Sequence, residues 1–315
     1  MSRPLASIVV PAYNEGPELA GNLCALARYL STAQSPYDFE IIVVDDGSTD
    51  ATYETASAAA LEIPELRIVR HSRNRGLGSA IRTGFAFAEG SVAIVYDSDL
   101  SYAPEIVLRL LEQLDLDNDD LVLASPYMRG GKVANVPLLR RFLSREANRF
   151  LSFATNGRYS TLTCMVRAYR LSFFRNVPST EERMEINPEL AFSAIKRGAR
   201  VSEIPAVLRW SDGRAKTRAR VSLRRTAKQI ARTMRYGVAH RPAVLLALPG
   251  IMPGVLPLML AIMVFLHLSL GTIAIITVIT MVIQNASLAL FAGQLAVFGR
   301  NTLRSARAQA PSARR

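Results

Sequence analysis

Two carboxylates, Asp97 and Asp99, stand one residue apart at the end of the apolar run Val92–Tyr96. If this run is a buried strand, its period of two puts both aspartates on the same side where the chain leaves the sheet. Two hard oxygen ligands in that position suit a Mg²⁺ or Mn²⁺ ion that also binds a diphosphate. The alternative interpretation is an ordinary acidic turn after a strand.

The elements that would position these carboxylates alternate between strands and helices over residues 1–125. Val- and Ile-rich runs predict strands buried on both faces, at Ser7–Val10, Glu40–Val44, Arg67–Val69, Val92–Tyr96 and Asp120–Ala124. Helices are predicted near Pro17–Leu30, Ala51–Leu61, Leu77–Ala88 and Pro104–Leu114. This alternation predicts an α/β fold with a mainly parallel sheet and helices on both faces.

Polar residues collect after four consecutive predicted strands, where ligands bind in sheets of this kind. They occupy Pro11–Glu15, Asp45–Asp50, His71–Gly76 and Asp97–Asp99. Their convergence favours one binding site over four ordinary surface loops. In such a site Asp45 or Asp46 could accept hydrogen bonds from a base or ribose, while Asp97 and Asp99 bind the cation.

The chain is less regular after residue 125. Helices are predicted at Leu138–Phe153 and Glu189–Arg197, and strands at Leu162–Tyr169 and Arg200–Leu208. The first of these helices carries Arg140 and Arg145 among its basic residues. With only two cysteines among 315 residues, neither a disulfide framework nor a metal cluster is indicated, and a reducing cytosolic setting fits.

The basic character of the chain, +12 in formal net charge, belongs to its last third. No Asp or Glu occurs beyond Asp212, and residues 217–238 predict an amphipathic helix with Arg232 and Arg235 off its apolar stripe. Residues 243–268 and 272–298 contain no charged side chain, and each exceeds the roughly 20 residues needed to cross a bilayer.

These segments predict a transmembrane hairpin. Basic residues on both flanks place both flanks and the N-terminal domain in the cytoplasm. The predicted organisation is a domain at 1–212, a basic juxtamembrane helix at 213–240, a membrane hairpin at 241–300 and a basic tail at 301–315. Without an aromatic platform beside the basic helix, a nucleic-acid partner is not expected. The sequence leaves open both a monomer and a homo-oligomer.

Several stretches together resemble a known family. They are Val9–Glu15, Val44–Asp50, Asn74–Ala80, Asp97–Ser101, Arg167–Arg170 and Glu185–Leu190. Over residues 5 to 240 the chain resembles the family 2 inverting glycosyltransferases of GT-A fold, and among these the polyprenyl-phosphate glycosyltransferases typified by dolichyl-phosphate mannose synthase. The resemblance implies transfer of a sugar from a nucleoside-diphosphate sugar to a polyprenyl phosphate at the cytoplasmic face of the membrane.

Donor-site residues follow from the matching positions. The resemblance implies nucleotide contacts from Pro11, Tyr13, Glu15 and Asp46, and we add Asp45 and Arg73 from the polar strand ends. It implies metal–diphosphate binding by Asp97 and Asp99, which makes Asp99 a catalytic candidate as well.

The acceptor side departs from the family pattern. Relatives read Gly-Ser-Arg-Tyr where this chain has Ala124–Tyr127, and Asp-x-Thr-Ser-Gly-Phe-Arg where it has Thr161–Arg167. An arginine, an aspartate and a glycine implied on the acceptor side are therefore absent. The candidates for binding an acceptor phosphate in their place are Arg129, Lys132, Arg140, Arg145, Arg214 and Lys216.

The nature of the acceptor stays open at this point. A phosphate acceptor is already ionised near neutral pH and needs no general base, whereas a hydroxyl on a membrane glycolipid would need one. Glu185 and Glu189 are the carboxylates available for that role. A third possibility is a membrane protein that binds sugar nucleotides without catalysis, which the intact Asp97-Ser98-Asp99 argues against.

Overall fold

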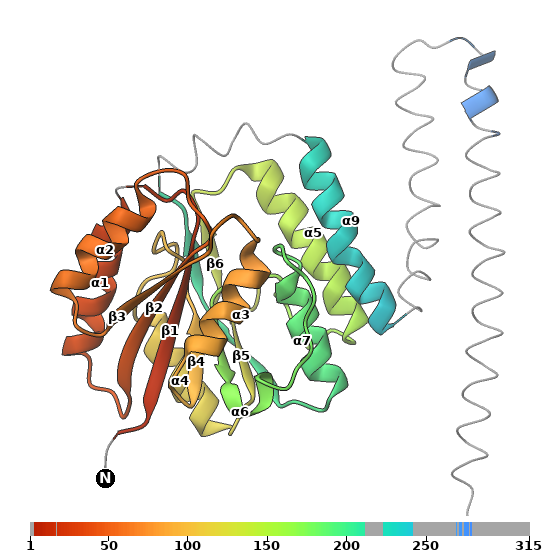
Figure 1. Cartoon of the computed structure of the whole chain (residues 1–315). Coiled ribbons are helices and arrows are strands. Elements are labelled where there is room, and N and C mark those ends of the chain that lie inside the picture. Colours follow the sequence, from red (N-terminus) through yellow and green to blue (C-terminus); the bar gives the residue numbers. More distant parts are fainter. Residues whose placement is uncertain are drawn as a thin grey trace, which may run out of the picture. The chain divides into compact units, whose positions relative to one another are not determined.

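A computed structural model describes residues 3–16, 18–211, 223–241 and seven positions between 269 and 278. The chain divides into two compact units, Met1–His240 and Arg241–Arg315. All strands and helices named below belong to the first unit (Figure 1).

The first unit is built on a seven-stranded sheet in the order β3-β2-β1-β4-β7-β5-β8. Its strands are β1 (Leu5–Ala12), β2 (Asp38–Asp45), β3 (Leu66–Arg70), β4 (Val92–Val95), β5 (Leu121–Ser125), β7 (Arg167–Arg170) and β8 (Val201–Pro205). Every strand is parallel except β7, which runs antiparallel between β4 and β5. The five strands predicted before residue 125 are confirmed, as is the mainly parallel α/β sheet.

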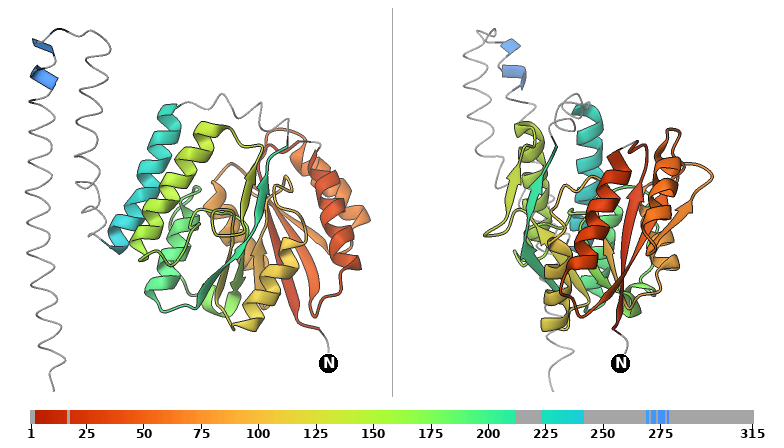
Figure 2. Two further views of the ribbon diagram at one scale, coloured as in Figure 1. Left: turned by 180° about the vertical axis from the view of Figure 1, so that it is seen from behind. Right: turned by 90° about the vertical axis from the view of Figure 1, so that its left-hand side faces the viewer.

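Helices cover both faces of this sheet (Figure 2). The helices are α1 (Glu18–Thr32), α2 (Thr52–Glu62), α3 (Leu77–Phe87), α4 (Ile106–Leu116), α5 (Leu138–Ala154), α6 (Leu171–Phe174), α7 (Ile186–Lys196) and α9 (Leu223–His240). A small second sheet pairs β6 (Lys132–Ala134) with β9 (Val207–Arg209). The predicted strand Arg200–Leu208 is thus two strands in two sheets, β8 and β9.

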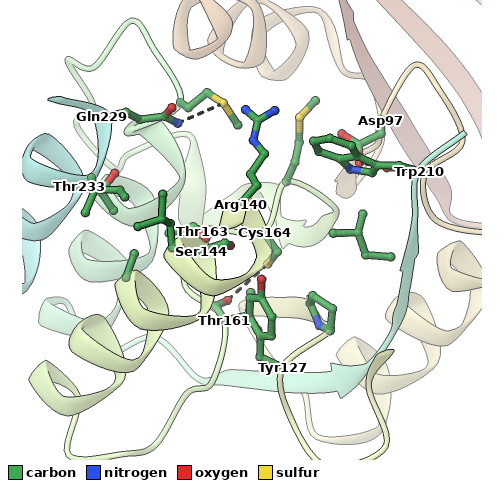
Figure 3. A pocket seen from close by; sticks show the side chains of 18 of the residues that line it. Asp97, Tyr127, Arg140, Ser144, Thr161, Thr163, Cys164, Trp210, Gln229 and Thr233 are labelled. Atoms are coloured by element: carbon green, nitrogen blue, oxygen red, sulfur yellow. Dashed lines mark hydrogen bonds between the residues drawn. The ribbon is translucent and has the colours of Figure 1, made fainter. Parts of the chain in front are cut away.

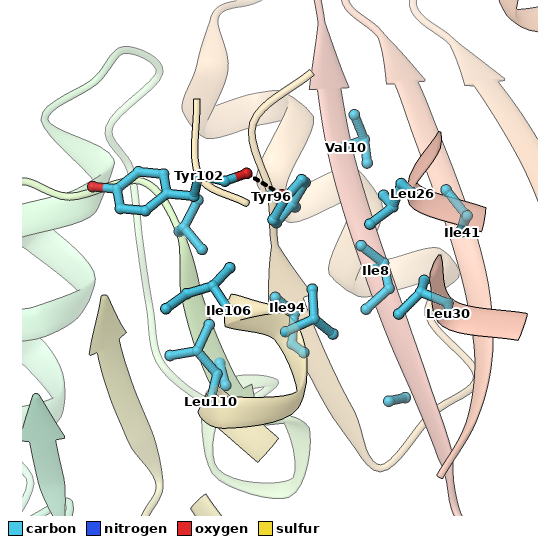
Figure 4. Close-up of a cluster of buried hydrophobic side chains, with 14 of the residues drawn as sticks. Ile8, Val10, Leu26, Leu30, Ile41, Ile94, Tyr96, Tyr102, Ile106 and Leu110 are labelled. Carbon is cyan, nitrogen blue, oxygen red and sulfur yellow. Dashed lines mark hydrogen bonds between the residues drawn. The ribbon is translucent and has the colours of Figure 1, made fainter. Parts of the chain in front are cut away.

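The core is packed on both faces of the sheet because the central strands β1, β2, β4 and β5 are mostly apolar. On one face Ile8 and Ile94 meet Leu26 of α1 and Leu110 of α4 (Figure 4). On the other face α3 packs on β1 and β2, and the ring of Phe85 lies 5.0 Å from that of Tyr169. Continuous apolar strands are what a sheet covered on both sides requires.

Helix α9 packs against α5 and α7 at the edge of the unit (Figure 1). It lies within the predicted juxtamembrane segment 213–240, and its partners inside the unit are described below. In the described part of the chain, no helix is long and apolar enough to cross a membrane. The predicted spans 243–268 and 272–298 fall almost wholly outside the described residues, as does the tail 301–315.

Candidate active site

An open depression of about 610 Å³ lies at the carboxyl ends of β1, β2 and β3. Its described lining comes from the turns after these strands, and it includes the predicted donor residues Tyr13 and Arg73. Both side chains are exposed and so are accessible to a ligand. Gly47 has a φ of 69°, and a Cβ there would lie 2.3 Å from the backbone of Arg73. Only glycine therefore allows the turn after β2 to pack this closely against the loop after β3.

Asp46, a predicted nucleotide contact, is 3% exposed and uses both carboxylate oxygens within the protein. Oδ1 lies 2.7 Å from His71 Nδ1 and accepts a hydrogen bond from the Arg75 N–H at 2.9 Å. Oδ2 accepts the Gly76 N–H at 2.7 Å, and the far nitrogen of His71 lies 2.9 Å from Thr83 Oγ1. Asp46 therefore fixes the loop that carries Arg73 on the wall of the depression.

Asp45 is fully buried and is also occupied internally. Its Oδ1 accepts the Ser48 N–H at 3.0 Å, and its Oδ2 lies 3.1 Å from Arg70 Nε. Two further predicted contacts, Pro11 and Glu15, are not among the described lining of the depression. Pro11 is buried within β1, and the Glu15 N–H donates to Thr52 Oγ1 at 2.9 Å.

Asp97 and Asp99 follow β4 in a turn that contains Leu100 at a φ of 50°. The Ser101 hydroxyl donates to Asp97 Oδ2 at 2.5 Å, and the Ser101 N–H donates to Asp99 Oδ1 at 3.2 Å. Both aspartates are partly exposed. One serine thus orients both carboxylates at the carboxyl end of the central strand.

The donor set of this turn fits a divalent cation. Mg²⁺ is commonly bound by one or two carboxylates together with substrate phosphates and water. Within the described ranges, no three His, Cys, Asp or Glu side chains gather to hold a metal by themselves. A cation at Asp97 and Asp99 would therefore complete its coordination with donor phosphates and water.

A second cavity, of about 280 Å³, opens beside Asp97 (Figure 3). Its walls come from the turn after β4, from α5, from residues 161–165, from β9 and from α9. Asp97 and Arg140 are the two charged side chains among its described lining. More than half of the remaining lining is apolar: Tyr102, Pro126, Leu143, Ala147, Cys164, Met165, Met184, Leu208, Trp210 and Ile230.

Arg140 is the acceptor-side candidate that the fold brings into this cavity. Its guanidinium carbon lies 5.0 Å from the centre of the Trp210 ring. Arg129, Lys132 and Arg145 are exposed, and none of them is part of the described lining. The candidates Arg214 and Lys216 lie outside the described residues.

Tyr127 and Ser144 also line this cavity. Burial raises the pKa of Tyr127, and Ser144 together with the guanidinium groups of Arg141 and Arg145 opposes that shift. The tyrosine therefore offers a neutral hydroxyl, which can donate to an anion.

Glu185 and Glu189, the candidate general bases, are not part of the described lining of either cavity. Glu185 is 2% exposed, and its Oε1 accepts from Arg232 Nε of α9 at 2.9 Å. Glu189 accepts the N–H groups of Thr180 and Glu181 at 3.0 and 3.1 Å. Both glutamates thus hold the segment before α7 in place.

That segment, residues 180–185, is called the crossing segment because it passes from α3 to α9. The Gly78 N–H donates to the Glu182 carbonyl at 2.8 Å, and Arg82 donates to the Glu181 carbonyl at 2.7 Å. The Glu181 carboxylate in turn accepts from Arg235 and Tyr236 of α9. Arg232 and Arg235, two basic residues of the predicted juxtamembrane helix, therefore form ion pairs inside this unit.

Residues 161–166 form an irregular stretch, so the predicted strand Leu162–Tyr169 is wrong over its first half. The cause is Arg167, which is fully buried and donates to the carbonyls of Leu162, Cys164 and Asn187, each at 2.7 Å. The carbonyls that a strand would use are turned to this guanidinium. The stretch forms one wall of the cavity, and it is the stretch that the family resemblance assigned to the acceptor side.

Comparisons with known proteins show which family this chain belongs to. The sequence profile of glycosyl transferase family 2 matches residues 7–177. A dolichol-phosphate mannosyltransferase of Pyrococcus furiosus is 36% identical over 141 residues, which cover 45% of this chain and 38% of that protein. A polyprenol monophosphomannose synthase of Mycolicibacterium smegmatis is 33% identical over 205 residues, covering 63% of this chain and 75% of that protein.

Among solved structures, a glucosyl-3-phosphoglycerate synthase of Mycobacterium tuberculosis in complex with Mn²⁺, UDP and phosphoglyceric acid superposes with a TM-score of 0.57. The identity is 17%, and the match covers 76% of this chain and 78% of the other. This likeness confirms the GT-A fold. The chain spans little more than a third of the P. furiosus relative and 56% of an undecaprenyl-phosphate 4-deoxy-4-formamido-L-arabinose transferase of Pseudomonas fluorescens.

Proposed function

Because this chain belongs to glycosyl transferase family 2, we propose that it transfers a sugar from a nucleoside-diphosphate sugar to a polyprenyl phosphate. One observation carries the proposal. The cavity beside Asp97 is apolar over most of its described lining and contains a single basic side chain there, Arg140. A lipid phosphate has the same combination of one anionic group and a long apolar chain.

The donor would bind along the carboxyl ends of the strands. The nucleoside would lie in the depression with Tyr13 and Arg73, and the diphosphate would extend to Asp97 and Asp99. A Mg²⁺ or Mn²⁺ ion bound there would neutralise charge on the departing nucleoside diphosphate, a Lewis-acid role worth several kcal/mol. The relatives named above, and the Mn²⁺ and UDP in the solved structure, support this arrangement.

The acceptor phosphate would bind at Arg140, with the hydroxyls of Tyr127 and Ser144 as further donors. It would attack the sugar carbon from the side opposite the diphosphate, which inverts the configuration at that carbon. A phosphate monoester needs no general base near neutral pH. This suits a site whose described lining offers no carboxylate other than Asp97, and it makes the hydroxyl-acceptor alternative the weaker one.

We extend the proposal to the membrane. The first turns of α5 expose Leu138, Leu139 and Phe142 to 74, 55 and 60% beside the exposed Arg141. Apolar side chains interspersed with arginines are typical of helices that lie in a bilayer interface. Together with the apolar segments 243–268 and 272–298, this supports a catalytic domain held at the cytoplasmic face by two spans.

The transfer is tested with membranes from cells that express the full chain. Labelled UDP- and GDP-sugars are supplied with Mn²⁺ and a polyprenyl phosphate, and the lipid extract is examined. A labelled lipid that is cleaved by mild acid is expected, and it should be absent with Asp99→Ala. A labelled lipid stable to acid and alkali would instead indicate a hydroxyl acceptor. Donor binding without a labelled lipid from any of these sugars would contradict the proposal.

The membrane claim has its own test. Washing the same membranes with alkaline carbonate should leave the full chain in the pellet, and only detergent should release it. Release by carbonate would contradict the two spans and leave the transfer reaction untouched.

A further inference from the structure

Trp210 forms part of the cavity wall, and its backbone is fixed by the small sheet. It directly follows β9, whose last residue Arg209 pairs with Ala134 of β6. The Trp210 N–H donates to the Ala134 carbonyl at 3.3 Å, and its own carbonyl accepts from Asn135 Nδ2 at 2.8 Å. The indole is therefore carried by a paired strand end and not by a mobile loop.

The same strand end is tied to the proposed metal-binding turn. The Arg209 N–H donates to the Ser101 carbonyl at 2.8 Å, and the Ser101 hydroxyl donates to Asp97 Oδ2 at 2.5 Å. Two hydrogen bonds and one peptide unit thus connect Trp210 to the carboxylate on the donor side. Trp210 therefore has a defined place relative to Asp97, where the donor diphosphate would bind.

Arg140 has less support from its own helix. It lies in the first turn of α5, which starts at Pro137 without a side-chain cap and exposes Leu138 and Leu139. Its guanidinium carbon stacks 5.0 Å from the centre of the Trp210 ring. Such a cation–π contact stabilises a guanidinium over a ring face, and it does so more strongly when the pair is desolvated.

We propose that Trp210 is a positioning residue that holds Arg140 at a fixed separation from Asp97, so that the acceptor phosphate lies in line with the donor diphosphate. This inference rests on the proposed function, because it assigns Arg140 to the acceptor. Trp210 connects the two halves of the site: its backbone is linked to the donor side, and its ring contacts the acceptor-side Arg140. An in-line displacement depends on this separation.

The test uses the fact that Trp210 is the single tryptophan of the chain, so tryptophan fluorescence reports this residue alone. The full-length protein in detergent is titrated with farnesyl phosphate, farnesol and inorganic phosphate. A saturable change in emission is expected with farnesyl phosphate at concentrations where farnesol has no effect. Arg140→Leu should abolish the preference for the phosphate. An equal response to farnesol and farnesyl phosphate, or an unchanged preference in Arg140→Leu, would overturn the inference.

Kinetics give a second readout. Trp210→Leu should raise the acceptor KM by roughly 3- to 30-fold, the range that corresponds to the strength of the stacking contact. Trp210→Phe, which keeps a ring face, should raise it less, and nucleotide affinity should stay within about twofold of the wild type. In an Arg140→Leu background the effect of Trp210→Leu should largely vanish, because the two residues act as one unit.

The outcomes separate the two proposals. Transfer by the wild type with an unchanged acceptor KM in Trp210→Leu would overturn the positioning role and leave the proposed function standing. A loss confined to donor affinity would also overturn it, because Trp210 would then be a platform for the donor sugar. Absence of transfer by the wild type would refute the proposed function, while the fluorescence titration would still show whether Arg140 recognises a lipid phosphate.

Discussion

Replacing Asp46 with asparagine distinguishes a residue that builds the donor site from one that touches the donor. The carboxylate is 3% exposed and accepts hydrogen bonds from His71 Nδ1, the Arg75 N–H and the Gly76 N–H at 2.7–2.9 Å. Asparagine has the same shape, but its NH₂ group must face at least one of these three donors. The substitution therefore removes the negative charge and leaves a buried donor without an acceptor.

The magnitude follows from the contacts. A hydrogen bond to a charged group contributes about 1.5–3 kcal/mol, and a buried unsatisfied donor costs about 1–3 kcal/mol. We expect Asp46→Asn to lower the free energy of unfolding by about 3 kcal/mol. In a domain of 150–250 residues this corresponds to a fall in Tm of roughly 6–12 °C.

Thermal unfolding without nucleotide is the assay, and UDP and GDP binding is measured well below the transition. Affinity should fall too, because the loop with Arg73 loses its support. Asp38→Asn is the control, since this exposed aspartate begins the same strand β2. A Tm within about 2 °C of the wild type, combined with weaker nucleotide binding, would refute the structural assignment and make Asp46 a direct donor contact.

Three further outcomes are expected. Gly78→Ala should destabilise the protein by about 1–3 kcal/mol in urea titrations, because its Cβ would lie 1.9 Å from the Glu181 carbonyl oxygen. Gly21→Ala, in α1 with open space at its Cβ, should be neutral or stabilising, and a similar loss in both would contradict the close contact. Arg232→Ala should lower the free energy of unfolding by about 2–3 kcal/mol, because it leaves the buried carboxylate of Glu185 unpaired. Adding Glu185→Gln should recover part of that loss in stability, and no recovery would argue against the ion pair. Chelation with EDTA should abolish transfer, and Mn²⁺ or Mg²⁺ should restore it, whereas full activity in EDTA would exclude the role assigned to the cation.

Much of the donor half could be predicted from sequence because its signals are local. Apolar runs that end in polar clusters specify a parallel sheet and the edge where ligands bind. The spacing of Asp97 and Asp99 also fits an acidic turn, and the polar ends of the neighbouring strands are what favour a binding site. What the sequence could not distinguish was a carboxylate that faces a ligand from one that faces the interior, as with Asp45 and Asp46, since both follow the same strand.

The acceptor half depends on contacts between residues far apart in the chain. Glu185 was a plausible base until the fold placed Arg232 against it, 47 residues later. Arg140 of helix α5 was one of six basic candidates, and the Trp210 ring that it meets follows β9 of the small sheet. The first half of the predicted strand Leu162–Tyr169 forms a cavity wall instead, because the buried guanidinium of Arg167 must be hydrogen-bonded and binds the carbonyls of Leu162 and Cys164.

The antiparallel strand β7 has a consequence for the way this protein is synthesised. β5 pairs with β7 and β8 but not with β4, so β7 must be in place before β5 can join the sheet. Until then the nascent chain presents β4 as an open edge of four apolar residues. About seventy residues separate β4 from β7, which at 5–20 residues per second leaves that edge unpaired for roughly 4–14 s on the ribosome. The strand that precedes the two aspartates is therefore completed on its second edge only after β7 has been made.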